Sequence, residues 1–589
     1  MARNRFDVDE ELESPFNIKH LLRAGQYIRK YKEKMTLSLI YSFLSAASAL
    51  LGPLLIRQGL NVAVPNKDYK QLVILALLML VSIAVSVFFG NIRSRYMTVV
   101  GQNVIYEIRK DLFAHLQKLP FQFYDDRPHG KILTRVVNYV NSVADALSNG
   151  IINFVLEIFN LILIAIFMIT CEVRLALIVM CGVPIFLVVV FLLKKAQRRA
   201  WQNVSNKSSN MNAYLHESLD GMKITQVFTR ESENAEIFDG LNKNFVKSWM
   251  KAQYTSNLIW LSVENISTVV IGAMYIVSLF MIGPELQVGT IIAVSSYAWR
   301  FWQPILQLSN LYNTFINAVA YLERIFEMMD EPVTVDDVEN ATEMPEISGD
   351  VHFNDVTFSY DGNVNILENF NLDVKAGESI ALVGPTGAGK TTVVNLIARF
   401  YNLTSGELLL DDYDLSKVTL KSLRSRIGIM LQDSFIFSGT IMDNIRYGRL
   451  DATDEEVMKA AETVCAHEFI VEMEKGYQTE VNERGSRLSQ GQKQLIALAR
   501  TLLSDPAILI LDEATSSIDA KTEKMLQTGI QALLKGRTSF IIAHRLSTIK
   551  NCDRILYIAD KGIAESGPHE ELLEKKGFYY QLYTAQMDE

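Results

Sequence analysis

The segment "ESIALVGPTGAGKTTVVNLIARF", residues 378–400, determines how the C-terminal part of this chain folds. Its composition predicts an apolar strand, then a glycine-rich loop, then a helix. The loop contains three glycines that let a backbone wrap around phosphate groups: Gly384, Gly387 and Gly389. Lys390 is placed to reach the outer phosphates, and the Thr391 hydroxyl is placed to ligate Mg²⁺. The segment therefore predicts a site for a nucleoside triphosphate.

Two later strands end in polar residues that suit the same site. In "ILILDE", residues 508–513, a strand typical of a buried parallel sheet ends at Asp512, placed to hold Mg²⁺, and at Glu513. A carboxylate at this second position can polarise a water for attack on the γ-phosphate; the plainer alternative is a solvated acid at a helix cap. In "FIIAHRL", residues 540–546, His544 is placed to contact the γ-phosphate or else is structural.

A second candidate anion site lies in "RLSQGQKQL", residues 487–495. Ser489 and Gly491 stand where a helix is expected to begin, and the free N–H groups at a helix start favour an anion. Because residues 384–391 already supply a better phosphate site, the question is which phosphate this second site serves.

The apolar residues are concentrated before about residue 320, although hydrophobic residues make up 49% of all 589. Six stretches approach the roughly 20 residues that cross a bilayer as a helix. They run from 35 to about 61, 71–92, about 147–170, 175–193, about 258–282 and about 290–315. The sequence therefore predicts six membrane spans followed by a domain of a different kind.

The distribution of charge indicates how the spans are oriented. Basic residues crowd before the first span, which favours a cytoplasmic N-terminus, and six crossings return the C-terminus to the cytoplasm. The first span begins too late and is too long for a cleaved signal peptide. A net charge of −9 argues against a general nucleic-acid binder. Four cysteines lack the spacing of a metal site: Cys171, Cys181, Cys465 and Cys552.

The loops predict where the domains meet. Two long cytoplasmic loops contain short breaks, residues 121–130 and 214–224, which either dock on a partner domain or are solvated helical turns. The acidic stretch "EPVTVDDVENATEMPEISGD" reads as a linker. We expect an N-terminal cytoplasmic segment with an elbow helix, a membrane domain with cytoplasmic extensions, a linker and a nucleotide-binding domain, at residues 1–34, 35–328, 329–349 and 350–589.

Taken together, these motifs resemble the nucleotide-binding domain of ABC transporters over about residues 350–580. Tyr360 in "FSY" resembles the adenine-stacking aromatic, "GPTGAGKT" the Walker A loop, "LSQGQ" the signature motif and "ILILDE" Walker B. Gln432 resembles the Q-loop glutamine, Asp519 the D-loop aspartate and His544 the switch histidine. The resemblance implies an ATPase that binds ATP and Mg²⁺. Its expected catalytic residues are Glu513, His544 and Gln432; its metal ligands are Thr391, Gln432 and Asp512; Thr392 adjoins the nucleotide.

The resemblance also answers the question of the second phosphate. In this family two nucleotide-binding domains stack head to tail, so Ser489 and Gly491 are expected to serve a nucleotide held by another subunit. One set of motifs and six spans make half a transporter, which must dimerise. The family pattern is LSGGQ, whereas position 490 is glutamine: its side chain would weaken the contact with phosphate, and losing glycine would restrict φ. An altered signature beside an intact Glu513 favours a heterodimer, with a homodimer as the alternative.

The membrane part is similar to that of ABC exporters. The amphipathic stretch "FNIKHLLRAGQYIRKYK" before the first span and "TEVNERG" before the signature both match that class. The expected fold is thus an all-α six-helix transmembrane domain followed by an α/β P-loop ABC ATPase domain, in the cytoplasmic membrane and surrounded by lipid. The expected function is ATP-driven export of amphipathic substrates such as drugs. Alternatives are a lipid or peptide exporter, a nucleotide-gated channel, and a soluble ABC ATPase acting on DNA.

Ionisable and aromatic residues inside the spans are candidates for substrate contact. Glu157 and Glu264 lie within predicted spans, where a charge is costly and often functional. Tyr297, Arg300 and Trp302 lie near the centre of the last span. A cavity that combines aromatic rings with carboxylates would suit amphipathic cations. The alternative is that the charged residues pair with one another or face water.

Overall fold

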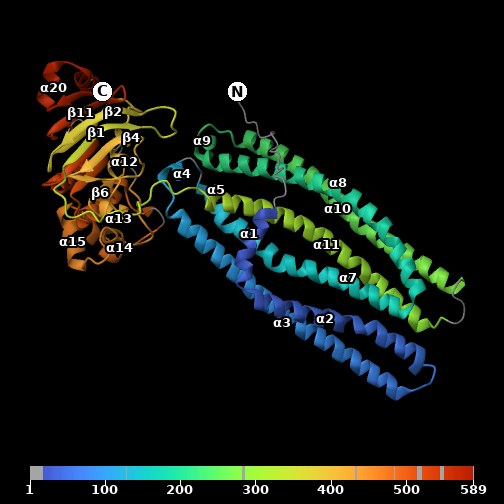
Figure 1. Ribbon diagram of the computed structural model, residues 1–589. Helices are drawn as coiled ribbons and strands as arrows, with labels where there is room; N and C mark the ends of the chain where they lie inside the picture. The colour runs from blue at the N-terminus through green and yellow to red at the C-terminus, as the bar shows by residue number, and fades with distance from the viewer. Residues whose placement is uncertain are drawn as a thin grey trace. The chain divides into compact units, whose positions relative to one another are not determined.

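The computed structural model describes residues 18–587, except 126, 128, 281–285, 432–433, 483–484, 514–519 and 544–548. The chain forms two compact units (Figure 1). The first comprises Met1–Leu116 and Gly130–Asp330, and the second comprises Gln117–His129 and Glu331–Glu589. The first unit is helical and the second combines sheets with helices, as the sequence predicts. A short segment from the first long loop between predicted spans thus belongs to the second unit.

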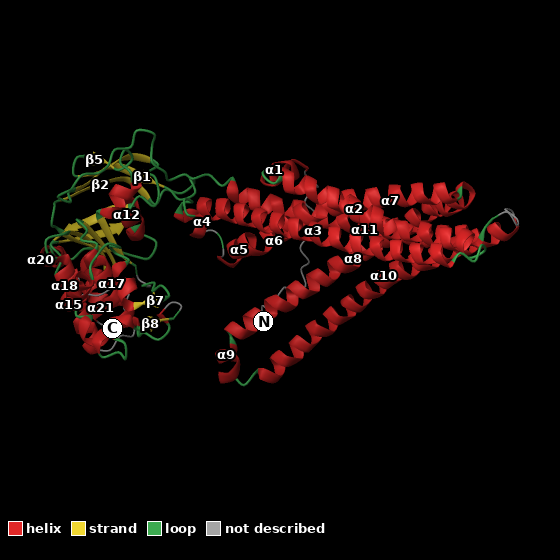
Figure 2. Ribbon diagram, turned by 90° about the horizontal axis from the view of Figure 1, so that it is seen from below, coloured by secondary structure: helices red, strands yellow, loops and turns green. Residues whose placement is uncertain are grey.

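The first unit consists of long helices that pack in pairs (Figures 1 and 2). Helix α2 pairs with α3, α8 with α10, and α7 with α11. The short helix α9 closes the α8–α10 hairpin (Figure 2). The bounds are α1 (Ile18–Arg29), α2 (Lys32–Gln58), η1 (Gly59–Ala63), α3 (Tyr69–Leu116), α5 (His129–Thr134), η2 (Arg135–Tyr139), α6 (Val140–Asp145), η3 (Ala146–Gly150), α7 (Ile151–Cys171), α8 (Val173–Asp220), α9 (Met222–Val227), α10 (Glu231–Phe280) and α11 (Val288–Met329).

Five of the described helical stretches are long and apolar enough to cross a membrane. They are Lys32–Ala63, Tyr69–Leu116, Ile132–Cys171, Val173–Asp220 and Glu231–Leu279. The sixth predicted span lies in α11, which has 42 residues but is not among the five. Polar residues such as Arg300 and Gln303 lower the mean hydropathy of α11.

The elbow helix α1 is attached to the first unit by polar contacts. The Arg23 guanidinium donates to both carboxylate oxygens of Asp330 at 2.5 and 2.7 Å, and Arg23 also stacks over Phe326. The Tyr27 hydroxyl donates to Asp111 at 3.0 Å. The amphipathic stretch predicted before the first span is therefore a helix whose polar side chains reach α3 and the end of α11.

The second unit contains a six-stranded and a four-stranded sheet. In the larger sheet the order is β12-β11-β3-β10-β9-β6, parallel except for β12; in the smaller, antiparallel sheet it is β2-β1-β4-β5. The strands are β1 (Val351–Phe358), β2 (Leu367–Val374), β3 (Ser379–Val383), β4 (Ser405–Leu410), β5 (Tyr413–Asp414), β6 (Ile427–Met430), β7 (Gly439–Thr440), β8 (Glu480–Val481), β9 (Ile508–Glu513), β10 (Thr538–Ala543), β11 (Arg554–Ala559) and β12 (Gly562–Gly567).

The helices of this unit are short. They are α4 (Phe121–Asp125), α12 (Lys390–Ile397), α13 (Leu420–Ser425), α14 (Ile441–Arg446), α15 (Asp454–Thr463), α16 (His467–Val471), η5 (Gly476–Gln478), α17 (Gln490–Leu503), α18 (Ala520–Leu534), α20 (His569–Lys575) and α21 (Phe578–Met587). Alternate residues of the parallel strands enter two different hydrophobic cores: Phe540 and Ile542 pack in one, and Ile541 packs in the other. This explains why the strands are apolar without interruption, since both faces are buried.

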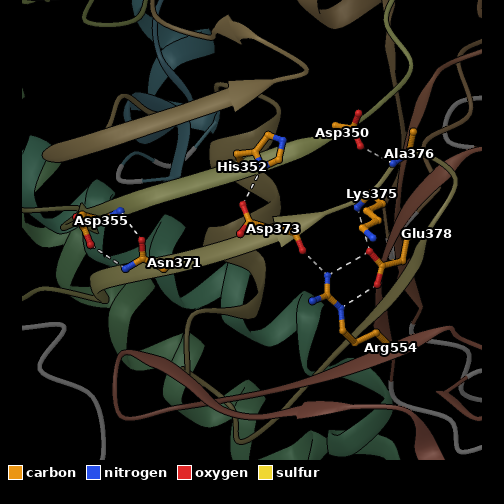
Figure 3. Close-up of polar contacts among 9 residues, drawn as sticks. All are labelled: Asp350, His352, Asp355, Asn371, Asp373, Lys375, Ala376, Glu378 and Arg554. Carbon is orange, nitrogen blue, oxygen red and sulfur yellow. Dashed lines mark hydrogen bonds and ion pairs between the residues drawn. The ribbon is translucent and has the colours of Figure 1, made fainter.

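Polar contacts join the smaller sheet to the strand that precedes the phosphate loop (Figure 3). Arg554 on β11 pairs with Glu378 at 2.9 Å and also donates to the Asp373 carbonyl oxygen of β2. The Asp373 carboxylate is 2.7 Å from the His352 ring on β1. Beside these, the Ala376 N–H donates to Asp350 at 2.8 Å. The turn into β3 is therefore fixed on both sides, which holds the start of the candidate site in place.

Candidate nucleotide site

The phosphate loop connects β3 to α12, as predicted. All three of its glycines have φ in the left-handed region: Gly384 at +138°, Gly387 at +83° and Gly389 at +104°. A Cβ on Gly384 would overlap the carbonyl oxygen of Ile558. Gly389 is the N-cap of α12, where its conformation lets the loop turn into the helix. Glycine is therefore required by both the loop geometry and its close neighbours.

Lys390 opens α12 and folds back over the loop. Its Nζ donates to the carbonyl oxygens of Gly384 at 2.8 Å and Pro385 at 2.9 Å. Burial lowers the pKa of Lys390, and the charge of Asp512 partly opposes that shift. A cation held here, beside a helix N-terminus, suits an incoming triphosphate, because the added negative charge would favour the charged lysine.

The two neighbouring threonines differ in what they can bind. Thr391 is exposed, whereas Thr392 is buried and its hydroxyl lies 3.0 Å from that of Tyr360. Of the two threonines, Thr391 is therefore the one whose hydroxyl is accessible to a divalent cation, as the sequence predicts together with Asp512 on β9. Mg²⁺ bound with a nucleotide needs only one or two protein oxygens, since phosphates and water supply the rest. Among the described residues, no cluster of three or more His, Cys, Asp or Glu forms a candidate metal site.

The register of the sheet places the predicted acids. On β9, Asp512 lies opposite Ile542 and Glu513 opposite Ala543, at the carboxyl ends of neighbouring parallel strands. Ligands of such sheets bind outside the carboxyl ends of the strands, where the phosphate loop also lies. The Glu513 side chain and three further predicted residues, Gln432, Asp519 and His544, lie outside the described residues.

Tyr360 is a structural part of the site as well as a candidate for adenine contact. Its ring packs edge-on against Phe358 and Tyr401, with centroids 4.8 and 5.0 Å away. Its hydroxyl reaches Thr392 in α12. The residue therefore links β1 to the phosphate-binding helix.

Sequence reasoning missed the residues that hold α4 against this site. The amide of Gln122 donates to the carbonyl oxygen of Tyr360 at 3.0 Å, and the Tyr401 hydroxyl donates to Asp125 at 2.9 Å. The Phe121 ring lies 4.4 Å from that of Phe400. The segment 121–130 was expected to dock on a partner domain or to be a solvated turn, and its residues 121–125 are packed against other parts of the same unit. Its aromatic residues were the signal, but their partners lie far away in sequence.

The second predicted anion site is the start of α17. Ser489 is the N-cap: its side chain accepts from the Gln492 N–H, while Gln492 accepts from the Ser489 N–H at 2.9 Å. Gly491 is buried and Gln490 is exposed. Position 490 is the first helical residue, and it is not among the residues with positive φ. The expectation that losing glycine restricts φ here is therefore wrong, because an L-residue suits a helical conformation; only the added side chain distinguishes this signature.

The candidate substrate residues do not form one site. Tyr297 is buried and its hydroxyl donates to the Leu50 carbonyl oxygen at 2.5 Å. Trp302 is buried and its ring stacks on that of Phe186 with centroids 5.0 Å apart. Glu264 is exposed on α10. In the described part of the chain, Tyr297 and Trp302 pack inside the helical unit and Glu264 faces outward, and none of the three lines the cavity that contains the other candidates.

The other two candidates share a cavity of about 400 Å³ between α2, α3, α7 and α11. Glu157 and Arg300 line it, together with Arg93, which sequence reasoning did not single out. Arg93 follows directly after a predicted span, where a basic residue is expected as a flanking charge, so the sequence gives no separate signal for it.

The first unit is helical and has spans long enough to cross a membrane. The second has a phosphate loop and a capped signature helix. Together they define a membrane-embedded P-loop ATPase. Residues 35–305 match the family described as the ABC transporter transmembrane region, and residues 367–516 match the family described as ABC transporter. The chain belongs to the ABC transporter family, and it is an ATPase coupled to transport across a membrane.

Similar proteins share nearly the whole chain. The uncharacterised ABC transporter ATP-binding protein YknV of Bacillus subtilis is 40% identical, over 100% of this chain and 98% of its own length. YgaD of the same organism, named for multidrug export, is 35% identical over 96% and 99%. A fatty acid ABC transporter ATP-binding/permease protein of Mycobacterium bovis is 36% identical over 84% and 78%. A bacterial Atm1-family ABC exporter with ATP bound has TM-score 0.78 and 28% identity, over 94% of this chain and 98% of that one.

Proposed function

We propose that this chain is one half of a dimeric exporter that moves amphipathic substrates, drugs among them, out of the cytoplasm. ATP would be hydrolysed at the interface between two nucleotide-binding domains. The observation that carries the dimer is the tip of the α8–α10 hairpin, where large apolar side chains face solvent. Their exposed fractions are Leu219 66%, Ile224 65%, Val227 78% and Phe228 68%. A cluster of this kind at the end of a long extension is typical of a protein-binding surface.

In the proposed site each residue predicted from the sequence has one role. Lys390 holds the β- and γ-phosphates, while Thr391 and Asp512 ligate Mg²⁺, which would neutralise charge on the phosphates as the bond breaks. Tyr360 contacts the adenine ring. Glu513 accepts a proton from the attacking water, with Gln432, Asp519 and His544 around the γ-phosphate.

The contacts of α4 supply a route from the nucleotide to the membrane. Gln122 is bonded to the backbone of Tyr360, and α4 continues from the cytoplasmic end of α3. A change at the adenine-binding segment therefore acts on the chain that leads directly into a membrane helix. ATP would favour the state with closed nucleotide-binding domains, and hydrolysis would release it.

The second subunit is proposed to be a different chain, with a homodimer as the alternative. Gln490 places an exposed side chain at the mouth of α17, where a phosphate of the partner's nucleotide would approach. The Gln490 side chain would weaken phosphate binding at one of the two ATP sites, as expected in a heterodimer whose two sites differ. Both termini are placed in the cytoplasm, because basic residues precede the first span.

The class of substrate rests on the membrane cavity and on relatives. YgaD is named for multidrug export, which supports drugs, and the fatty acid transporter of M. bovis supports a lipid-like substrate as the alternative. Both are amphipathic, and the cavity combines apolar with polar lining, as such molecules require.

Glu513→Gln tests the proposed cycle. The variant should bind ATP and close but lose ATP turnover by at least about 100-fold, because the general base is gone. ATPase activity of the purified transporter and cross-linking of the nucleotide-binding domains in ATP would be measured, with Glu480→Gln, an exposed carboxylate on β8, as the matched control. Wild-type turnover by Glu513→Gln would show that the assignment of the base is wrong.

A further inference from the structure

The cavity between α2, α3, α7 and α11 contains more positive than negative side chains. Two guanidinium groups, from Arg93 and Arg300, and one carboxylate, from Glu157, line it. In the described part of the chain neither arginine forms an ion pair. We propose that this cavity binds the anionic head group of an amphipathic substrate, a carboxylate or its equivalent, through Arg93 and Arg300; this inference rests on the proposed export function and specifies its substrate class.

Arg93 has a buried donor for which the described residues supply no acceptor. Its Nε is buried and has no hydrogen-bond partner among the described residues. The one carboxylate in the described lining, Glu157, acts on it through space but is hydrogen-bonded to Asn160. A buried guanidinium nitrogen without a hydrogen-bond partner is costly, so its partner is expected to come from a ligand.

Arg300 is held so that its remaining donors reach the cavity. One of its terminal nitrogens donates to the Ala49 carbonyl oxygen at 2.8 Å, which fixes the side chain against α2. Guanidinium groups bind carboxylates through paired parallel hydrogen bonds, so a planar anion matches the donors that stay available.

The other polar groups in the lining divide into satisfied and available donors. Ser42 donates to the Ser38 carbonyl oxygen at 2.7 Å, and Ser45 and Ser86 each donate to the other's carbonyl oxygen at 2.9 and 3.0 Å. These hydroxyls close the wall between α2 and α3. The amides of Gln303 and Gln307 lie one turn apart on α11, on the same side as Arg300, and add neutral donors for an anion.

The rest of the lining explains why the ligand must be amphipathic. Ala46, Leu50, Leu156, Ile164 and Pro304 supply apolar walls beside the charged groups. A volume of about 400 Å³ is within the range of small-molecule sites. A cationic drug of the same size would instead meet an excess of positive charge.

A pair of probes that differ only in head group tests the inference. Dansyl-labelled undecanoic acid and its methyl ester would be titrated into the full transporter in nanodiscs of phosphatidylcholine, a lipid without net charge, with binding followed by fluorescence. The acid should bind at least about 10-fold more tightly than the ester, as expected for charge-assisted hydrogen bonds. The analogue with a quaternary ammonium head should bind more weakly than both.

Substitutions then assign the effect to the two arginines. Arg93→Gln and Arg300→Gln should each lower the affinity for the acid by about 10-fold. The affinity for the ester should change by less than about 2-fold, which would also show that the site is still folded. Glu157→Gln should tighten the acid, because it removes a like charge. Arg95→Gln is the matched control, since Arg95 is exposed on α3 and is not part of the lining. Equal binding of acid and ester, or equal losses for both in the arginine variants, would overturn the inference.

Transport assays separate this inference from the proposed function. If the arginine-dependent preference for the acid holds but proteoliposomes show no ATP-driven movement of any probe, the export function fails and the anion site stands. If ATP drives transport while Arg93→Gln and Arg300→Gln bind the acid as the wild type does, export stands and the anion site is wrong.

Discussion

The short helices at the two loop breaks that the sequence predicts to be cytoplasmic, α4 and α9, are here called the tips, and they differ in what covers their apolar side chains. Phe123 in α4 is only 3% exposed, because that helix packs within the nucleotide-binding unit. Val227 in α9 and the adjoining Phe228 are 78% and 68% exposed. The two tips thus differ: α4 is covered by its own chain, and α9 has an apolar surface that a second chain is proposed to cover.

The largest effect is expected at the exposed tip. Val227→Asp should reduce ATPase activity and transport of the assembled protein by at least about 10-fold, because a carboxylate would be buried without a partner in the proposed contact. Subunit mass by light scattering and ATPase activity would be measured together. Gln226→Asp adds the same charge at a polar neighbour and should have a smaller effect. Normal assembly and activity of Val227→Asp would remove the proposed difference between the tips.

An intermediate effect is expected at the packed tip. Gln122→Ala removes the bond to the Tyr360 carbonyl oxygen and should lower the substrate transported per ATP several-fold, while ATP affinity changes by less than about 2-fold. Gln117→Ala, at an exposed position of the same loop, is the matched control. Unchanged coupling in Gln122→Ala would mean that α4 anchors the unit without transmitting motion.

The smallest effect is expected from a single hydroxyl. Tyr401→Phe removes the bond to Asp125 and should lower the free energy of unfolding by about 1 kcal/mol, which corresponds to roughly 2–4 °C in Tm for a unit of this size. Differential scanning fluorimetry of the full chain would measure it. Tyr447→Phe serves as the control, since the Tyr447 ring is exposed. An equal shift in both variants would show that the Asp125 bond does not stabilise α4.

Local signals made the nucleotide-binding unit predictable from the sequence. The glycines of the phosphate loop need φ values that few other residues adopt, and Ser489 is a preferred N-cap three residues before Gln492. Uninterrupted apolar strands imply burial on both faces. Each of these features is determined by residues close together in the chain, so a single sequence is sufficient to recognise it.

Features that depend on distant contacts were not predictable in the same way. The partners of α4 lie more than two hundred residues away, at Tyr360 and Tyr401. Tyr297 and Trp302 resembled cavity residues, but which side of a long apolar helix faces a neighbour is decided by packing. Arg93 was hidden among flanking basic residues, and only the cavity distinguishes it from them.

The cap of α17 has a consequence for the proposed contact with the partner's nucleotide. Because the oxygen of the Ser489 hydroxyl accepts the Gln492 N–H, the hydroxyl proton remains available as a donor. The same hydrogen bond fixes the Ser489 side chain, so that little conformational entropy is lost when the side chain meets a phosphate of the partner's nucleotide. The Ser489 oxygen that caps the helix thus also preorganises the side chain for binding.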